Sequence, residues 1–363
     1  MKIVGLDILH CPIELPQAVC FGEVEIRARD YVVVRIRTDS GVDGYSVSYA
    51  RGTPLPEALA ILGQKTLSQD ALLRRRIVHS LQQNFIPGQA SFVRAISAID
   101  IALWDIAAKV ANLPLYRLLG GFRKEIPLAA VAGYFPETRS NESLETEIKG
   151  LVDEGYGLIK MCLPGVDPTD DAKLIERLVK AASDARLAVD AHWMWSDLNT
   201  ARYACNLLDD LGLDFIEDPF APNLWRLTAE LRDNLQTPLA AGEDVTNAAG
   251  FQDLLKSVDV LRVDATASGG VTGALSAINL AEVSGRTVLP HVFLPLHSHI
   301  VAASPAATFA EFTTDPQIDP YVRLLNKPVN VTGGKMVMDD EPGNGWQVDW
   351  EAAVSLASRS VTV

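Results

Sequence analysis

Three short apolar runs in the middle of the chain each close on an acidic residue: RLAVD (residues 186–190), LDFIE (213–217) and PLAAGE (238–243). Consecutive strands of a parallel barrel are separated by a helix and two loops. Residues that recur roughly every 25 positions therefore lie side by side at the carboxyl ends of neighbouring strands. Carboxylates gathered at one such edge repel each other unless a cation holds them, and a set of oxygen ligands favours Mg²⁺ over Zn²⁺. The sequence thus predicts a Mg²⁺ site made by Asp190, Glu217 and Glu243.

Similar runs continue on both sides of this central segment, and together they make eight strand candidates. They end at Tyr134, Cys162, Asp190, Glu217, Gly242, Asp264, His291 and Glu311. Helical stretches such as DDAKLIERLVKAASDA and NTARYACNLLDDLG lie between them. Strands that alternate with helices form right-handed βαβ units, and eight of them close into a barrel. The predicted fold class is α/β, a (β/α)8 TIM barrel over residues 123–327. An open doubly wound sheet is the alternative, but no GxGxxG follows the first strand and no P-loop occurs.

The segments that flank the barrel have different sequence patterns. Residues 24–38, VEIRARDYVVVRIRT, read as strand, and apolar residues at steps of three and four in residues 91–119 read as helix. Residues 1–122 are therefore expected to form an α+β amino-terminal domain. The tail, residues 328–363, returns to short strands and is expected to pack back on that domain.

Composition restricts the partners and the compartment. The 363 residues carry a formal net charge of −14, which argues against nucleic-acid and anionic-membrane surfaces. No stretch approaches the roughly 18 apolar residues of a membrane span. The opening MKIVGLDILH lacks the pattern of a signal peptide, so a cytoplasmic location is expected. The four cysteines show no CxxC spacing and are expected to be reduced thiols.

The other strand ends supply acid and base groups. Asp264 and His291 close neighbouring strands, where a carboxylate can hydrogen-bond an imidazole, fix its tautomer and raise its proton affinity. His291 is therefore a candidate base that Asp264 orients. Lys160 and Glu311 lie on the second and eighth strands of the predicted barrel.

Longer motifs resemble a known family over nearly the whole chain. They are AISAIDIALWDIAAKVANLPLYRLLGG (95–121), VDAHW (189–193), FIEDP (215–219), AAGED (240–244), SGGVTGA (268–274) and EPGNGW (341–346). They resemble the mandelate racemase and muconate lactonizing enzyme branch of the enolase superfamily. The resemblance implies a modified barrel with a capping domain, Mg²⁺ on the three acids, a His291–Asp264 dyad and Glu311 hydrogen-bonded to a substrate carboxylate. It also implies a homo-oligomer, a dimer or an octamer, and closure of the barrel mouth by residues 13–25 and the segment around Arg51.

The chain departs from the family's pattern in two places. The family's second strand usually ends in Lys-x-Lys, whose second lysine is a base, whereas this chain reads Lys160-Met161-Cys162. Cys162 shares the inward face of Lys160 because strand side chains repeat every two residues, and it is expected to shape the pocket rather than carry protons. His192, two residues beyond Asp190, is a candidate for substrate contact or for a second acid, and Arg51 for contact with a second substrate carboxylate.

These features predict an enzyme that removes the proton next to a carboxylate. Mg²⁺, Lys160 and a protonated Glu311 would stabilise the enediolate after His291 has taken the proton. With the second lysine absent, the expected activity is dehydration of a small hydroxy-carboxylate, an aldonate or aldarate, to a 2-keto-3-deoxy acid. A racemase or epimerase, a lactone cycloisomerase and a catalytically silent binding barrel remain alternatives.

Overall fold

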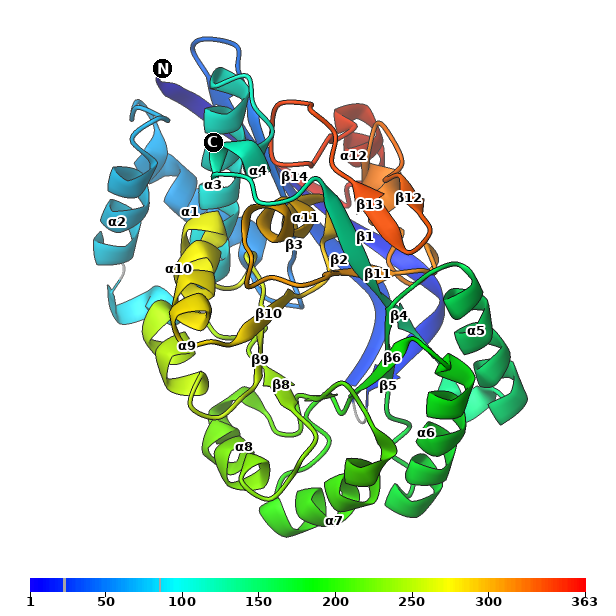
Figure 1. Cartoon of the computed structure of the whole chain (residues 1–363). Helices are drawn as coiled ribbons and strands as arrows, with labels where there is room; N and C mark the ends of the chain where they lie inside the picture. The colour runs from blue at the N-terminus through cyan, green and yellow to red at the C-terminus, as the bar shows by residue number, and fades with distance from the viewer. Residues whose placement is uncertain (22–23, 85) are drawn as a thin grey trace.

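The computed structural model describes residues 1–21, 24–84 and 86–363, and two sheets organise these residues (Figure 1). The smaller sheet is antiparallel, in the order β14-β1-β2-β3. Its strands are β1 (Ile3–Phe21), β2 (Val24–Thr38), β3 (Gly44–Tyr49) and β14 (Arg359–Thr362). The last strand of the chain therefore completes the sheet that the first strand begins.

Four helices follow β3 in the amino-terminal part: α1 (Leu55–Thr66), α2 (Arg74–Asn84), α3 (Gln89–Val110) and α4 (Leu115–Leu118). The apolar side chains that recur along α3, such as Ile96, Ile99 and Leu103, are buried in one cluster with Val32 and Val34 of β2. The period of α3 and the alternation of β2 thus bury their apolar faces against each other.

In residues 86–363, which the structure describes without a gap, eight strands form a parallel barrel. They are β4 (Glu125–Ala132), β5 (Leu158–Cys162), β6 (Arg186–Asp190), β7 (Ile216–Glu217), β8 (Leu239–Ala241), β9 (Val260–Val263), β10 (Thr287–Pro290) and β11 (Ala310–Thr313). Neighbours in the chain pair in parallel from β4 to β10, and β11 returns to pair with β4. An isolated parallel bridge between Val288 of β10 and Ala307, just before β11, connects the last two strands and closes the ring.

Helices connect these strands on the outside of the ring, as Figure 1 shows for α5 to α10. They are α5 (Asn141–Asp153), α6 (Pro168–Ala182), α7 (Leu198–Leu208), α8 (Trp225–Arg232), α9 (Ala248–Leu254), α10 (Gly270–Val283) and α11 (Leu294–Ala303). β12 (Val331–Thr332) and β13 (Lys335–Val337) form a short hairpin, and β13 pairs antiparallel with the beginning of β4. The helix α12 (Trp350–Leu356) precedes β14.

The interior of the barrel changes from apolar to charged within two residues along its strands. A separate buried cluster is made by Ala129, Leu158, Ala188, Phe215, Ala240 and Leu289. Side chains two positions apart share a face of a strand, so the next inward residues after Leu158, Ala188 and Phe215 are all charged. They are Lys160, Asp190 and Glu217. An apolar floor therefore lies directly beneath a polar layer at the carboxyl ends of the strands.

The predicted eight-stranded barrel is confirmed, with strand ends displaced by one to two residues at several positions. Residues 13–25, expected to close the barrel mouth as a loop, are not a loop in their described part: they are the end of β1 and the beginning of β2, with a register shift between Glu14 and Val19. Gly22 and Glu23, which belong to the same expectation, lie outside the described residues. The division at residues 122 and 123 stays a prediction.

None of the helices in the described residues combines the length and the apolar character that a bilayer span requires. All four cysteines are free, and only Cys20 among them is exposed.

A buried histidine joins α11 of the barrel to α4. His299 is 3% exposed, and the backbone N–H of Tyr116 donates a hydrogen bond to its Nδ1 at 3.1 Å. Burial lowers the pKa of His299 from its ordinary value of 6.5 to about 3. The ring is therefore neutral in the folded protein, and Nδ1 can act as the acceptor.

We expect His299 to make the free energy of unfolding fall as the pH is lowered. The unfolded chain takes up a proton on His299 below pH 6.5, whereas the folded protein resists doing so until about pH 3. The contribution of the neutral ring is thus present above pH 6.5 and is lost across that window. Between pH 7 and pH 5, wild type should lose about 2 kcal/mol more unfolding free energy than His299→Gln, which keeps an acceptor for Tyr116. Urea denaturation of both proteins at each pH measures this difference, and equal losses would contradict it.

Candidate active site

A cavity of about 550 Å³ opens at the carboxyl ends of the barrel strands, and β2 of the smaller sheet covers it. Its lining includes most of the side chains that the sequence singled out: Arg51, Lys160, Cys162, Asp190, His192, Glu243, His291 and Glu311. Glu217 and Asp264 are at most 1% exposed and bond to residues of the lining. The predicted site residues are therefore brought to one place.

The backbone is strained where the strands end at this cavity. His192 and Trp193, which follow β6, have φ values of 43° and 63°, and Asp218 after β7 has 44°. Val292 and Phe293 after β10 have 37° and 44°. A β-branched or aromatic residue rarely adopts a left-handed conformation, and such strain is typical of active sites. The turns after β6 and β10 border the large cavity, and Asp218 lies beside its metal-ligand candidates Glu217 and Glu243.

Lys160 lies at the centre of the polar layer. Its Nζ is 2.7 Å from Glu217, 2.8 Å from Glu311 and 3.1 Å from Asp190. Burial alone would lower the pKa of Lys160, but the three carboxylates outweigh burial and raise the pKa well above its usual value. The side chain therefore supplies a permanent positive charge to the polar layer that lines the cavity.

Arg262 is a second buried cation that joins the same carboxylates from below. It is fully buried, and its guanidinium donates to Glu217 and Glu311 at 2.7 Å each and to the carbonyl of Leu289 at 2.9 Å. Lys160 and Arg262 thus share Glu217 and Glu311, and the four side chains form one closed network. This network fixes the positions and orientations of the Glu217 and Glu311 carboxylates within the polar layer.

The surroundings of Glu311 favour its ionised form. Burial opposes ionisation, but Arg262 and Lys160 outweigh it and hold the pKa of Glu311 well below its usual range. Its Oε2 also accepts a hydrogen bond from the backbone N–H of Val292 at 2.8 Å. The expectation that a protonated Glu311 donates to the substrate does not fit these contacts, because Oε2 accepts from Arg262 and Val292 and Oε1 lies 2.8 Å from the ammonium group of Lys160.

His291 is held between two acids at the rim of the cavity. Its Nδ1 is 3.1 Å from Oδ2 of Asp264, and its Nε2 is 3.2 Å from Oε2 of Glu243. Burial opposes protonation of the ring, yet Glu243 and Asp264 outweigh burial and raise the pKa of His291. The Nδ1 contact fixes the ring in the way expected for a base that acts through Nε2.

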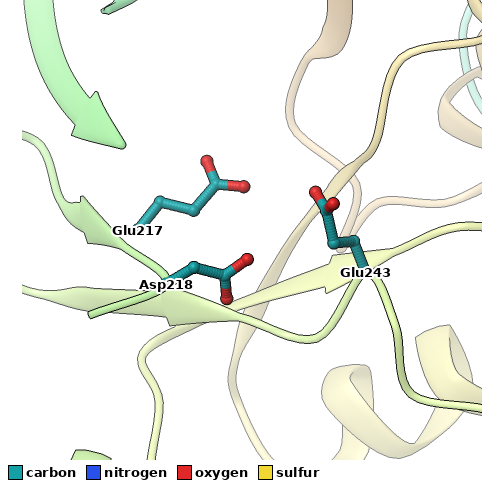
Figure 2. Close-up of side chains that lie close together, drawn as sticks. All are labelled: Glu217, Asp218 and Glu243. Carbon is teal, nitrogen blue, oxygen red and sulfur yellow. The ribbon is translucent and has the colours of Figure 1, made fainter. Parts of the chain in front are cut away.

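Three buried carboxylates, Glu217, Asp218 and Glu243, converge at the carboxyl ends of the strands (Figure 2), and Glu243 also contacts His291. Among the described residues, Glu217, Asp218 and Glu243 place one oxygen each within 4.8 Å of one another. Asp190, the residue paired with Glu217 across β6 and β7, lies outside this group but is joined to it through Lys160. The structure therefore offers four carboxylates where the sequence predicted three ligands.

The donor set fits a hard divalent cation. All four groups are carboxylates, which Mg²⁺ prefers to nitrogen or sulfur ligands. Burial, together with repulsion from Asp190 and Glu311, raises the pKa of Glu217, and burial with repulsion from Glu243 does the same for Asp218. A bound cation would offset both effects, since it favours the ionised form.

The remaining predicted residues line the cavity in different ways. Burial raises the pKa of the Cys162 thiol, which suits a neutral wall beside the charged groups, since Cys162 pairs with Asp190 across β5 and β6. His192 stacks on Trp193 with ring centroids 4.5 Å apart. Arg51 points toward the barrel rather than toward the far end of the cavity, because its guanidinium is 3.5 Å from Glu243 and 3.6 Å from Asp244.

Sequence reasoning missed Arg262 and Asp218. Arg262 lies two residues before Asp264 in the sequence, so the alternation of strand side chains would have placed it on the same inward face. Asp218 follows Glu217 and would point outward on a regular strand. Its left-handed backbone brings it to the same side, and no sequence signal announced that turn.

The chain matches known families over most of its length. Residues 4–120 match the mandelate racemase / muconate lactonizing enzyme N-terminal domain, and residues 143–353 match the enolase C-terminal domain-like family.

Individual relatives include several dehydratases. Arabinonate dehydratase of Saccharolobus solfataricus is 26% identical, and the alignment covers 88% of each chain. L-talarate/galactarate dehydratase of Salmonella typhimurium is 28% identical over 88% of this chain and 81% of its own. Among solved structures, L-talarate dehydratase from Polaromonas sp. JS666, complexed with Mg and L-glucarate, superposes with a TM-score of 0.89 at 25% identity, covering 100% of this chain and 99% of that one.

Proposed function

The chain belongs to the mandelate racemase and muconate lactonizing enzyme branch of the enolase superfamily, and from that membership we propose that it is a Mg²⁺-dependent dehydratase of acid sugars. The observation that carries the proposal is His291, held by Asp264 at the rim of a cavity whose floor is Lys160 and a group of buried carboxylates. The names of the dehydratase relatives support the same reaction class.

We assign Asp190, Glu217 and Glu243 as the residues that hold Mg²⁺. Asp190 and Glu243 border the large cavity, whereas Asp218 borders a separate, much smaller one behind Glu243. When bound, Mg²⁺ neutralises negative charge that develops on the substrate carboxylate. Lys160 adds a fixed positive charge beside it, and Glu311 keeps Lys160 and Arg262 in place.

The chain's own groups then move the protons. Nε2 of His291 takes the proton from the carbon next to the carboxylate, while Asp264 stabilises the imidazolium through Nδ1. The same imidazolium can return its proton to the departing β-hydroxyl in a syn elimination, or His192 can protonate it in an anti elimination. The product is an enol that becomes a 2-keto-3-deoxy acid. Burial raises the pKa of the Cys162 thiol, so the chain lacks the second base that the family's usual Lys-x-Lys pattern supplies on this strand.

The reaction is tested by incubating the purified protein and Mg²⁺ with a broad panel of aldonates and aldarates. Formation of semicarbazide-reactive keto acid supports the proposal. Solvent deuterium at the α-carbon with inversion and without loss of water would instead favour the racemase or epimerase. Absence of both signals over the whole panel would contradict the proposal and leave a lactone cycloisomerase or a catalytically silent barrel.

Metal binding should distinguish the two possible sets of ligands. Asp190→Asn is expected to weaken Mg²⁺ binding by more than about 100-fold, because it removes a direct ligand. Asp218→Asn neutralises a carboxylate that is buried to a similar extent, and it should weaken binding by only about 10-fold, the lower end for a group that merely supports the ligands Glu217 and Glu243. Isothermal titration of each protein with Mg²⁺ measures both values. The reverse order would assign the site to Glu217, Asp218 and Glu243.

We further propose the domain division at residues 122 and 123, a homo-oligomer of two or eight subunits, and a cytoplasmic location. These proposals rest on the sequence patterns and on family membership. Limited proteolysis, light scattering after size-exclusion chromatography and cell fractionation test them in turn.

A further inference from the structure

One arginine of the cavity differs from its neighbours in having no acidic partner. Arg29 lies on β2, and its Nε donates to the backbone carbonyl of Ile318 at 2.7 Å. Its guanidinium also sits 5.8 Å from the centre of the Tyr49 ring. Within the described part of the chain, no carboxylate comes within 4.0 Å of it, whereas Arg27 pairs with Glu25 and Arg51 with Glu243.

The nearest acid is already occupied by other groups. Asp319 follows Ile318, and its Oδ1 accepts hydrogen bonds from the hydroxyls of Tyr31 and Tyr49. The carboxylate is thereby directed to the tyrosines instead of to Arg29. Tyr49 contacts both partners, since its ring faces the arginine and its hydroxyl binds the acid. The guanidinium is consequently anchored on one side by Ile318 and Tyr49 while its terminal amino groups remain available to the cavity.

Arg29 lies on the opposite wall from the catalytic groups. It is carried by the smaller sheet that covers the cavity, while Lys160 and His291 come from the barrel beneath. A substrate whose first carboxylate meets Lys160 therefore extends its other end toward β2. A cavity of about 550 Å³ is within the usual range for small-molecule sites.

We propose that Arg29 binds a second carboxylate at the far end of the substrate, so that the enzyme acts on acid sugars with a carboxylate at each end, the aldarates. An arginine fork matches a carboxylate in two parallel hydrogen bonds, and a half-buried guanidinium that no carboxylate of the described residues contacts favours an anionic ligand. A terminal hydroxymethyl group, as in an aldonate, would leave the guanidinium without a carboxylate to hydrogen-bond. This inference rests on the proposed dehydration and specifies its substrate class.

The test compares substrates that differ only at the far carbon. Pentarates and hexarates are each assayed against the aldonate of the same configuration, with wild type, Arg29→Met and Arg29→Lys. Wild type should prefer the aldarate. Arg29→Met should lower kcat/KM for the aldarate by about 100-fold, mainly through KM, and change that for the aldonate by less than about 3-fold. Arg29→Lys keeps the charge without the fork and should lose about 10-fold.

Arg27→Met serves as the matched control. It removes the same charge two residues earlier on β2, where the side chain is 74% exposed and pairs with Glu25, so the aldarate preference should remain. A wild-type enzyme that prefers aldonates, or an Arg29→Met variant that loses both substrates equally, would overturn the inference while leaving dehydration intact. If no acid sugar reacts at all, the proposed function fails. Calorimetric binding of aldarates then still decides the role of Arg29, because undiminished affinity in Arg29→Met would refute it.

Discussion

His291→Asn is expected to lower kcat for acid-sugar dehydration by about 10⁴-fold, near the upper limit for loss of one acid–base group. The loss should be this large because, in a syn elimination, a single imidazole both takes the α-proton and protonates the leaving hydroxyl. Asn keeps a polar group near Asp264 and Glu243 but cannot carry the proton. Steady-state assays of keto-acid formation measure the effect, and exchange of the α-proton with solvent deuterium should disappear in parallel.

Two comparisons make this result specific. Calorimetric titration should show that His291→Asn still binds Mg²⁺, which excludes collapse of the neighbouring carboxylates as the cause. His192→Asn then separates the two stereochemical routes. In a syn elimination it leaves α-proton exchange and dehydration within about 10-fold of wild type, whereas in an anti elimination exchange persists and dehydration falls by about 100-fold or more. Substantial dehydration by His291→Asn would remove this residue from the mechanism.

The sequence predicted the barrel and much of its functional end because both depend on local patterns. An apolar run that ends in Asp190 or Glu217 predicts both a strand and the residue at which that strand ends. Parallel order then places such ends together without any knowledge of packing. The same logic located His291 and Asp264 on neighbouring strands, and the structure places their side chains 3.1 Å apart.

Other features could not be predicted because they depend on side-chain contacts between distant segments. The environment of Glu311 is set by Lys160 and Arg262 from two other strands, and these contacts favour its ionised form over the protonated form expected from the sequence. Arg51 likewise has a left-handed backbone, with φ of 50°, and its guanidinium lies 3.5 Å from Glu243 of the barrel. Arg29 remains without an acid only because two tyrosines occupy Asp319, a residue 290 positions away in the chain.

The largest effect on stability is expected from Arg262→Met. A buried ion pair as a whole contributes little, since the gain in attraction is offset by the loss of hydration. Removing one partner is different, because it leaves Glu217 and Glu311 buried with only Lys160 to compensate them. We expect the unfolding free energy to fall by about 3–5 kcal/mol, as measured by urea denaturation without added Mg²⁺.

The size of this loss should depend on charge rather than on volume. Arg262→Lys retains the cation but makes fewer of the contacts to Glu217, Glu311 and the carbonyl of Leu289, so it should lose distinctly less stability than the Met variant. Adding Glu311→Gln to Arg262→Met removes one of the uncompensated charges and should restore part of the loss, a coupling that a double-mutant cycle measures. If Arg262→Met matches wild type in stability, or if the second substitution merely adds its own cost, the closed network of two cations and two carboxylates is not what holds the polar layer above the apolar floor of the barrel.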